Sequence, residues 1–420
     1  MRRPALLTLN AGSSSVKFSL FLVEGDAIVE TPHAWGQIDG IGTAHPRWRA
    51  ATQDGRRREE SPLTLTGELE QQHHDAFSHL VDWLRAHVDD VKILATGHRI
   101  VHGGARFREP VRLTPEMVAE LEQLVPLAPL HQPHNLRPIK RMLERRPTWT
   151  QVGCFDTAFH TTQPWFAQMF PLPRKLFDEG IRRYGFHGLS YDYVNRRLPD
   201  VLGPERARGR VIIAHLGNGA SLCALREGKS VATTMGFTTI DGVMMGTRSG
   251  SIDPGLVLHL IEYGGMSVAQ VDHMLYKESG LLGVSGISQD MRELLASDDP
   301  HAKDAVELFC YRLVREIGSL AAALGGLDAL VFTAGIGEHA APVRARVIER
   351  LDWLGAVLDP QANERTAGVA GRIDAPESRV ALAVVPTNEE AMIARYTLEV
   401  LRRDGSATIA ANPPAADANR

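Results

Sequence analysis

A strand, a glycine-containing turn and a second strand recur in both halves of this 420-residue chain, and this repeat constrains the fold most strongly. In the first half, apolar runs at 5–9 and 16–23 flank a small polar turn at 10–15. In the second half, runs at 211–214 and 220–225 flank residues 216–219. Gly12 and Gly217 take equivalent places 205 residues apart, about half the chain length. One duplication at this spacing favours two similar domains over a solenoid, whose repeats are several-fold shorter.

Helical and strand patterns alternate along the remaining sequence. This alternation is typical of α/β domains whose sheets are covered by helices, and the length suits two cores. Residues 53–62 are polar and are expected to form a surface loop. The predicted strands are 91–96, 150–155, 329–333 and 380–385. Helices are predicted at 69–87 and 254–264. Four more helices are expected: one that begins at Thr114-Pro115, one capped by Ser267 and Gln270, one after Pro342, and one that ends near residue 402.

Composition excludes several functional classes. A formal net charge of −4 and a pI near 6.5 give no electrostatic case for nucleic acid or a membrane surface. Residues 317–337 carry one charge and are divided by Gly325-Gly326, which favours a buried helix, turn and strand over a membrane span. The three cysteines are far apart and the N-terminal apolar run is too short for a secretory signal. We therefore expect a cytoplasmic protein with reduced, buried thiols.

Three glycine-rich turns follow strands, at 10–15, 215–219 and 333–338. Small residues there let backbone N–H groups approach a polyphosphate, and Lys17 lies just beyond the first turn. The chain contains neither G-x-x-x-x-G-K-[ST] nor a G-x-G-x-x-G that opens a βαβ unit. The turns therefore indicate a nucleotide phosphate site that is neither a P-loop nor a Rossmann dehydrogenase site.

Charged residues beside glycines are the candidates for chemistry. Arg99 precedes a Gly-Gly turn, and Arg248 lies in a polar turn. Each guanidinium could bind carboxylate or phosphate oxygens of a ligand, and a structural salt bridge is the alternative role. Asp156 follows a buried strand, as an active-site acid or a helix N-cap. His187 lies between Phe186 and Gly188 and is a further candidate for the site. The alternative is a structural role, as a partly buried histidine whose ring nitrogens are hydrogen-bonded within the protein.

At the start of the last helix, two glutamates have different expected roles. Thr387 and Glu390 have the spacing of a capping box, which leaves Glu389 available for a hard cation such as Mg²⁺. His73-His74 is expected on a polar helix face, and His131-x-x-His134 lacks the further ligands of a zinc site.

Nine segments in order resemble the acetokinase family and extend over residues 5–400. They are LLTLNAGSSSVKFSLF, GHRIVHGG, PLAPLHQPHN, FDTAFH, RRYGFHG, AHLGNGAS, MGTRSGSIDPG, FTAGIGEH and PTNEEAMIAR. The resemblance implies two duplicated ribonuclease-H-like α/β domains around a nucleotide cleft, as in the acetate and sugar kinase, heat-shock ATPase and actin superfamily. It implies an acetate kinase that transfers a phosphoryl group from ATP to acetate, in line and reversibly, giving acetyl phosphate and ADP.

The resemblance also implies domains at 1–155, rejoined by a helix at about 387–403, and 156–386. The small, polar composition of residues 404–420 predicts a disordered tail. A homodimer formed mainly by the C-terminal domain is expected, with no nucleic-acid or membrane partner.

Asn10 and Glu389 are implied ligands of Mg²⁺, with Mn²⁺ as the alternative metal. The implied catalytic residues are Asp156, His187 and Arg248; the implied substrate-binding residues are Arg99, His131, Val101, Leu130, Phe186 and Thr239. The implied nucleotide-binding residues are Lys17, His215, Leu216, Gly217, Asn218, Gly219, Asp290, Met291, Arg292, Gly335, Ile336, Gly337, Glu338 and His339.

Departures from the family pattern leave specificity open. Thr239 replaces a proline that is common in the family beside the pocket for the methyl group of the substrate, so the preferred acyl chain length stays open. His339 replaces an asparagine, so the nucleotide preference stays open as well. Gln132 replaces an asparagine, and Gly188-Leu189-Ser190-Tyr191 replaces Gly-Thr-Ser-His. One methylene changes selectivity by only ~1–3 kcal/mol, so a propionate or other short-chain acyl kinase is the alternative. The second alternative is a regulatory or structural nucleotide-binding protein of the same superfamily. Such a protein has no need for Arg99, Asp156, His187 and Arg248 together.

Acetate is already ionised at neutral pH, so Asp156 has no proton to remove from it. We therefore predict that Asp156 positions other groups or contacts Mg²⁺ rather than acting as a general base. Arginines and a histidine around the transferring phosphoryl group suit its loose transition state, whose charge is spread over three equatorial oxygens.

Overall fold

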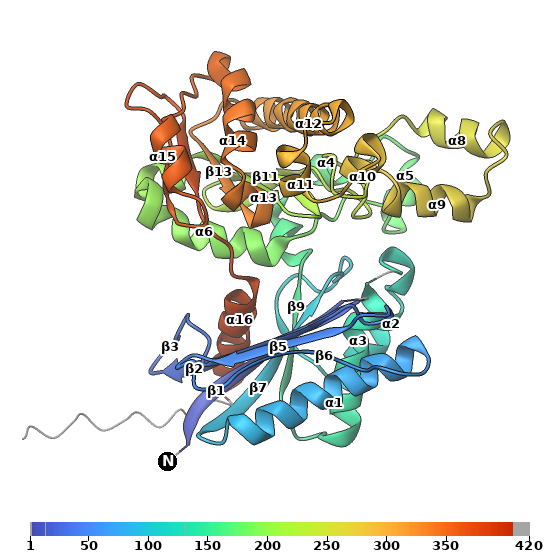
Figure 1. Ribbon diagram of the computed structural model, residues 1–420, viewed down its shortest axis with the longest axis vertical. Helices are drawn as coiled ribbons and strands as arrows, with labels where there is room; N and C mark the ends of the chain where they lie inside the picture. The colour runs from blue at the N-terminus through green and yellow to red at the C-terminus, as the bar shows by residue number, and fades with distance from the viewer. Residues whose placement is uncertain (1, 13, 130, 406–420) are drawn as a thin grey trace, which may run out of the picture. The chain divides into compact units, whose positions relative to one another are not determined.

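The computed structural model describes residues 2–12, 14–129 and 131–405, and the chain divides into two compact units (Figure 1). Unit 1 comprises Met1–Ala158 and Asn388–Arg420, and unit 2 comprises Phe159–Thr387. The chain thus returns to its first unit for the final helix. From residue 406 onward, the tail that was predicted to be disordered lies outside the described residues.

Unit 1 is built on one large mixed sheet with the strand order β6-β5-β4-β2-β1-β7-β9-β8, in which β3 also pairs with β2. β1, β2 and β4 form an antiparallel meander, whereas β7 and β9 run parallel to β1. The strands are β1 (Arg3–Ala11), β2 (Ser15–Glu24), β3 (Ala27–Ile28), β4 (Ala34–Asp39), β5 (Arg47–Thr52), β6 (Arg58–Pro62), β7 (Val91–Ile100), β8 (Val111–Arg112) and β9 (Gln151–Phe155).

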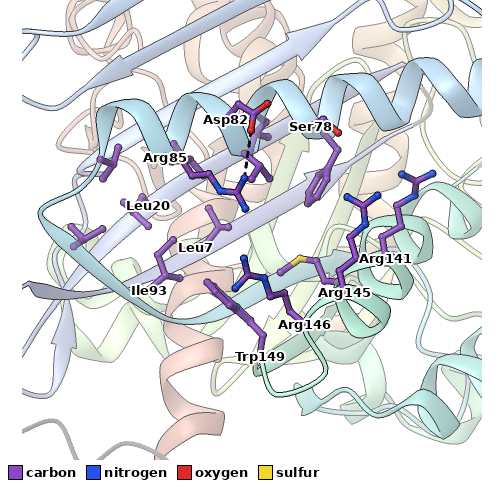
Figure 2. A pocket seen from close by; sticks show the side chains of 17 residues that line it. Leu7, Leu20, Ser78, Asp82, Arg85, Ile93, Arg141, Arg145, Arg146 and Trp149 are labelled. Atoms are coloured by element: carbon purple, nitrogen blue, oxygen red, sulfur yellow. Dashed lines mark ion pairs between the residues drawn. The ribbon is translucent and has the colours of Figure 1, made fainter.

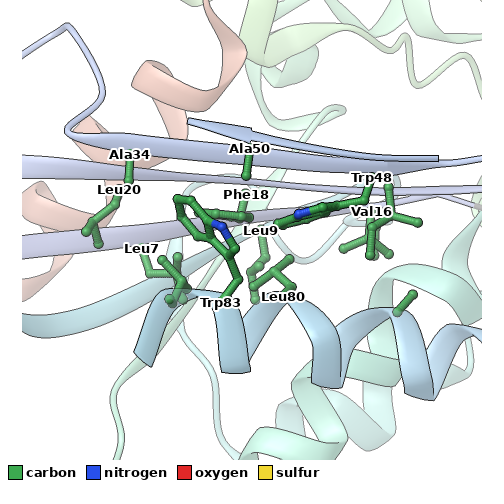
Figure 3. Close-up of a cluster of buried hydrophobic side chains, with 14 of the residues drawn as sticks. Leu7, Leu9, Val16, Phe18, Leu20, Ala34, Trp48, Ala50, Leu80 and Trp83 are labelled. Carbon is green, nitrogen blue, oxygen red and sulfur yellow. The ribbon is translucent and has the colours of Figure 1, made fainter. Parts of the chain in front are cut away.

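Helices cover both faces of this sheet (Figure 1). Apolar residues of α1 (Leu69–His87) pack with alternate residues of β1 and β2 in a core that includes Phe18, Trp48 and Trp83 (Figure 3). Met142 of α3 (Gln132–Arg145) packs against the same core. On the opposite face, α16 (Glu389–Arg403) packs against β1 and β7. A Cβ on Gly97 would lie 2.2 Å from Thr397 Oγ1, so only glycine permits this approach. The shorter helices of this unit are α2 (Pro115–Glu122) and η1 (Val125–Leu127).

Unit 2 repeats the topology of unit 1. Its sheet order is β12-β11-β10-β13-β15-β14, with an antiparallel β10–β11–β12 meander and with β13 and β15 parallel to β10. The series β4-β2-β1-β7-β9 of unit 1 therefore corresponds to β12-β11-β10-β13-β15, which confirms the predicted pair of duplicated ribonuclease-H-like domains. The strands are β10 (Arg210–Leu216), β11 (Ala220–Arg226), β12 (Lys229–Thr233), β13 (Ala329–Thr333), β14 (Gly371–Arg372) and β15 (Ala381–Val384).

Two long helices sandwich the second sheet. α6 contributes Tyr191, Val194 and Leu198 to a core with alternate residues of β10, β11 and β13, and α12 packs against β10, β11 and β12. The helices are η2 (Ala158–Thr162), α4 (Trp165–Gln168), α5 (Arg174–Asp178), α6 (Gly188–Leu202), α7 (Pro204–Ala207), α8 (Pro254–Glu262), α9 (Val268–Lys277), α10 (Gly280–Ser285), α11 (Met291–Ala296), α12 (Pro300–Leu324), α13 (Ala334–His339), α14 (Ala341–Ile348), η3 (Glu349–Leu354) and α15 (Pro360–Arg365).

Local signals predicted several of these elements well. The capping box of Ser267 and Gln270 is present, and Thr114 and Asp253 cap α2 and α8. Residues 317–333 form the end of α12, a turn and β13, as expected, and residues 334–337 begin α13. The three cysteines are buried and free. No helix within the described residues combines the length and apolar character needed to cross a membrane.

Four local predictions are wrong, and one of them is the turn expected at 333–338, most of which lies in α13. Residues 58–62 of the expected loop form β6, an edge strand with no buried residue, whose polar sequence therefore resembles a loop. Asn388, not Thr387, is the N-cap of α16, because its side chain accepts the N–H of Ala391. His73 is buried rather than on a polar face, with its ring 5.1 Å from that of His134.

Candidate active site

An arginine and an aspartate meet at one end of the unit 1 sheet. Arg99 Nε donates to both carboxylate oxygens of Asp156 at 3.1 Å, and Nη2 donates to Oδ2 at 2.7 Å. Arg99 lies near the end of β7 and Asp156 directly after β9, two neighbouring parallel strands. Parallel strands end at the same edge of a sheet, where ligands commonly bind in open α/β folds. Asp156 is thus a hydrogen-bonded partner of Arg99.

Further charged groups surround Arg99. Burial opposes its charge, but Asp156, then Glu389 and Glu390, outweigh that effect and raise the pKa of Arg99. Burial, followed by the charge of Glu389, raises the pKa of the half-buried Glu390. Arg99 is therefore a permanent cation beside three carboxylates.

The predicted metal ligands belong to the same unit. Asn10 lies at the end of β1, the strand beside β7, and pairs in register with Lys17, whereas Glu389 opens α16. Among the described residues no group of three or more His, Cys, Asp or Glu side chains could by itself hold a metal ion. An amide oxygen and a carboxylate nevertheless suit Mg²⁺, which keeps several waters and takes few protein ligands. The donor chemistry of Asn10 and Glu389 therefore fits that ion.

Two buried amide side chains, those of Asn135 and Gln132, hold the segment after β7. Asn135 Oδ1 accepts the N–H of Val101 at 2.9 Å, and its Nδ2 donates to the carbonyl of Ala11 at 2.6 Å. Gln132 Oε1 accepts the N–H of His102 at 3.2 Å, and its Nε2 donates to the carbonyl of the same residue at 3.0 Å. The unusual Gln132 thus satisfies both backbone groups of His102.

Of the residues predicted to surround the substrate, Val101 is buried directly after β7. His131 is half-buried at the N-cap position of α3. Leu130 lies outside the described residues. Phe186 is buried in unit 2. The apolar wall as a whole stays a prediction.

In unit 2 a network of hydroxyls and imidazoles holds His187. His187 precedes α6 with φ +59°, a left-handed conformation that is rare for a residue other than glycine. Its Nδ1 is hydrogen-bonded to Ser221 Oγ at 2.9 Å, and the same oxygen is hydrogen-bonded to the hydroxyl of Tyr191. The ring stacks 4.2 Å from that of His215, whose Nδ1 is hydrogen-bonded to Ser190 Oγ at 2.8 Å. Ser190 and Tyr191 both belong to the segment that departs from the family pattern.

Arg248 lies beside His187 at the turn between β10 and β11. A Cβ built on Gly219 would lie 3.5 Å from both Arg248 Nη1 and His187 Nε2, so these two groups converge on the glycine turn. Arg248 Nη1 also donates to the carbonyl of Thr239 at 3.1 Å. The N–H of Gly246 donates to the carbonyl of Asn218 at 3.0 Å. A guanidinium and an imidazole thus flank a turn with little side-chain bulk, an arrangement suited to a phosphate.

His160 supports the peptide that leads into His187. Its Nε2 donates to the carbonyl of Phe186 at 2.8 Å, and its Nδ1 is hydrogen-bonded to Ser230 Oγ at 3.0 Å. Burial lowers the pKa of His160 to about 4, so the ring is neutral at neutral pH. Gly185 has φ +75°, and a Cβ there would lie 2.7 Å from His160 Cδ2. The histidine ring therefore fits against a glycine that no larger residue can replace without movement.

The third glycine segment is the start of a helix rather than a loop. Gly335, Ile336 and Gly337 lie in α13, and Ala334 before them has φ +63°. Glu338 Oε1 accepts the N–H groups of Ala334 at 2.7 Å and Thr387 at 3.1 Å. His339 is exposed.

Arg344, which the sequence did not suggest, holds this segment in place. Its Nη1 donates to the carbonyls of Gly337 and Glu338 at 2.9 Å, and its Nε donates to Asn363 Oδ1 at 2.7 Å. The side chain is fully buried, which lowers its pKa to about 10.

The predicted nucleotide-binding residues 290–292 form hydrogen bonds mainly with one another. Asp290 is the N-cap of α11 and accepts the N–H of Arg292 at 2.9 Å. The exposed guanidinium of Arg292 is paired with the same carboxylate, and Met291 is buried. Their nucleotide role stays a prediction.

Comparisons with known sequences identify the family of this chain. The acetokinase family model matches residues 5–395. An acetate kinase of Rhodopseudomonas palustris is 53% identical over 391 residues, which are 93% of this chain and 97% of the relative. An acetate kinase of Methylocella silvestris is 48% identical over 401 residues, which are 94% of this chain and 98% of the relative.

Two solved structures are also similar. The acetate kinase of Porphyromonas gingivalis superposes with a TM-score of 0.83 at 37% identity, covering 95% of this chain and 100% of that one. A propionate kinase of Francisella tularensis gives a TM-score of 0.83 at 36% identity, covering 94% and 99% of the two chains. The family match over nearly the whole chain decides the assignment, and the chain belongs to the acetokinase family.

Proposed function

We propose that the chain is an acetate kinase, which transfers the γ-phosphoryl group of ATP to acetate and forms acetyl phosphate and ADP. The observation that carries the choice of a carboxylate acceptor is Arg99. Its guanidinium is a permanent cation, three-quarters shielded from solvent and oriented by Asp156 through Nε and Nη2. A planar guanidinium held in this way can present its remaining N–H groups to a carboxylate.

The roles of the residues follow from their chemistry. Arg99 binds the carboxylate of acetate, with Val101, Leu130, Phe186, Thr239 and His131 as the proposed surroundings. Asp156 orients Arg99 and removes no proton, because the carboxylate nucleophile is already ionised. Arg248 and His187 donate to the oxygens of the transferring phosphoryl group, where charge is spread in the transition state.

The nucleotide is proposed to bind through the glycine segments and Lys17. In unit 2 the contributing segments are 215–219, 290–292 and 335–339. Asn10 and Glu389 would hold Mg²⁺, with Mn²⁺ as a substitute, and the ion supplies charge neutralisation on the nucleotide phosphates. Arg344 donates to the carbonyls of Gly337 and Glu338 at the C-terminal end of α13, and these hydrogen bonds support the shape of the segment.

Two further properties belong to the proposal. A homodimer is expected from the family resemblance, and analytical ultracentrifugation tests it. A reducing, cytoplasmic location is consistent with three free, buried cysteines.

A hydroxamate assay of acyl phosphate formation tests the function directly. The purified chain is incubated with ATP and Mg²⁺, separately with formate, acetate, propionate and butyrate, and the series is repeated with GTP. Acetate is expected to give the highest kcat/KM. Failure to form acyl phosphate from any acid would overturn the proposal.

Propionate is the second candidate acceptor, because the propionate kinase of Francisella tularensis matches this chain as well as an acetate kinase structure does. Thr239 replaces a common proline at a position that the family resemblance assigns to the wall of the methyl pocket, so this replacement bears on the choice of acid. A preference for propionate in the hydroxamate assay would favour that alternative.

A further inference from the structure

A cavity of about 390 Å³ in unit 1 has no role in the proposed reaction (Figure 2). It lies between α1, the second half of α3 and the strands β1, β2 and β7. Val91 at the start of β7 and Trp149 just before β9 belong to its lining, so it opens near the ends of these strands opposite to Arg99 and Asp156. A volume of several hundred Å³ is typical of a small-molecule site.

The inner part of the cavity is apolar. Leu7 and Leu20 from the sheet, Leu84 and Val88 on the α1 side, and Met142 from α3 contribute to its lining. Several of these residues also belong to, or pack against, the main core of the unit. The Trp149 ring is half-buried at the edge, and its Nε1 donates to Thr96 Oγ1 at 3.0 Å. These walls suit a hydrocarbon chain.

The rim, in contrast, is strongly basic. Arg141 and Arg145 follow Arg137 at intervals of four residues, which puts all three on one face of α3. Figure 2 shows Arg141, Arg145 and Arg146 extending from the α3 side and Arg85 from α1. Asp82, which is 3.7 Å from Arg85, is the one carboxylate among the described residues of the lining. The side of the cavity formed by α3 therefore carries uncompensated positive charge.

A neighbouring hollow strengthens this interpretation. It shares Phe77 and Arg141 with the cavity and is also lined by Arg137. The Nη1 of Arg137 is buried and has no hydrogen-bond partner within the part of the chain that the structure describes. A buried guanidinium N–H without a partner is costly, and an anion or ordered water would relieve that cost.

We propose that this cavity binds a medium-chain fatty-acid anion, with the alkyl chain against Leu7, Val88 and Met142 and the carboxylate at Arg141 and Arg145. The apolar walls remove the chain from water, and the guanidinium groups match a carboxylate in charge and geometry. A metal ion is disfavoured by the arginines. The ligand is chemically distinct from acetate, because the cavity requires a long apolar tail.

Binding to the full-length chain is measured by calorimetry and by tryptophan fluorescence, with decanoate and laurate kept below their micelle concentrations. One molecule per chain is expected, and laurate is expected to bind about fifteenfold more tightly than decanoate, since each of its two additional methylenes contributes about fourfold. Dodecyltrimethylammonium and dodecyl maltoside carry an alkyl chain one carbon longer than that of laurate, without the anion, and are expected not to bind. Equal binding of either one would overturn the proposal.

Charge reversal tests the rim. The double variant R141E/R145E is expected to bind laurate at least tenfold more weakly, whereas R56E/R57E, in the exposed β5–β6 turn, is expected to bind it normally. If R141E/R145E does not fold by circular dichroism, R141Q/R145Q replaces it and the same loss is expected. Unchanged affinity in the folded variant would overturn the proposal.

A membrane surface is the competing target for the arginines. Cosedimentation with phosphatidylglycerol vesicles, together with the absence of one-to-one laurate binding, would overturn the proposal and assign these residues to a lipid surface. Saturable laurate binding that persists without vesicles supports the cavity.

Discussion

Asp156 accepts hydrogen bonds from both Nε and Nη2 of Arg99, so the two residues act as a single planar unit. Asp156 is 2% exposed, whereas Arg99 is 23% exposed, and the carboxylate therefore lies behind the guanidinium. In this arrangement Asp156 determines the orientation of Arg99. Removing one partner of a buried pair leaves the other uncompensated, which costs about 3–5 kcal/mol.

We expect Asp156→Asn to lower kcat/KM for acetate by about 10²-fold, because a misplaced positioning group costs about that much. The loss should be the same at each pH above the range in which acetate ionises, since no proton is transferred to Asp156. Initial rates in the hydroxamate assay over a range of pH provide the measurement.

Asp328→Asn is the matched control, because Asp328 forms a similar two-point pair with Arg210 in unit 2. It is expected to leave the activity within about twofold of the original. A rate for Asp156→Asn that recovers tenfold or more with rising pH would contradict the positioning role.

Ser221 is a positioning residue for His187, since its hydroxyl joins the imidazole to Tyr191. Ser221→Ala is expected to lower kcat about tenfold with little change in KM for acetate, because an interaction that matters mainly in the transition state is lost. The pH profile of kcat is expected to shift as well, since the ring loses its partner at Nδ1. Steady-state kinetics over a range of pH measure both effects.

A purely structural role for Ser221 makes a different prediction. In that case the melting temperature and kcat would fall together and the shape of the pH profile would not change. Ser297→Ala, at a surface turn of the same unit, serves as the control and is expected to retain full activity.

The repeat of strand, turn and strand could be predicted from the sequence because hairpins and amphipathic helices are local. Residues 69–87 and 329–333 were predicted with the bounds that α1 and β13 have. The edge strand β6 was missed because an exposed strand has no apolar periodicity. Residues such as Arg99 and Asp156 were recognised from motifs, but their pairing depends on the adjacency of β7 and β9.

The supporting polar residues could not have been found in the same way. Asn135 holds the carbonyl of Ala11, 124 positions earlier, and Arg344 holds a side chain 19 positions later. Nothing in the residues around Asn135 or Arg344 distinguishes a buried amide or guanidinium from a solvated one. The preference of buried polar groups for full hydrogen bonding becomes useful only when the tertiary contacts are known.

Arg344→Met should destabilise unit 2 and weaken nucleotide binding. The substitution leaves the carbonyls of Gly337 and Glu338 and the side chain of Asn363 without their donor, and each unsatisfied buried group costs about 1–3 kcal/mol. We expect a lower melting temperature and, in the folded fraction, a KM for ATP raised several-fold with KM for acetate unchanged. Thermal unfolding and steady-state kinetics measure these effects.

Arg346→Met, on the exposed side of the same helix, is the control and is expected to behave like the unchanged chain. A normal KM for ATP in the folded Arg344→Met variant would contradict a role for this residue in shaping the nucleotide segment.

His160 should make the stability of unit 2 depend on pH under mildly acidic conditions. Burial lowers its pKa from 6.5 to about 4, so between these values the unfolded chain binds a proton that the folded chain does not. The free energy of unfolding therefore falls as the pH falls through this window, by up to about 3 kcal/mol for this residue. In His160→Gln the titrating group is absent, so urea unfolding at successive pH values should show a shallower decline. His259→Gln, on the exposed surface of α8, should retain the original slope. An unchanged slope in His160→Gln would show that other groups dominate the acid sensitivity of this unit.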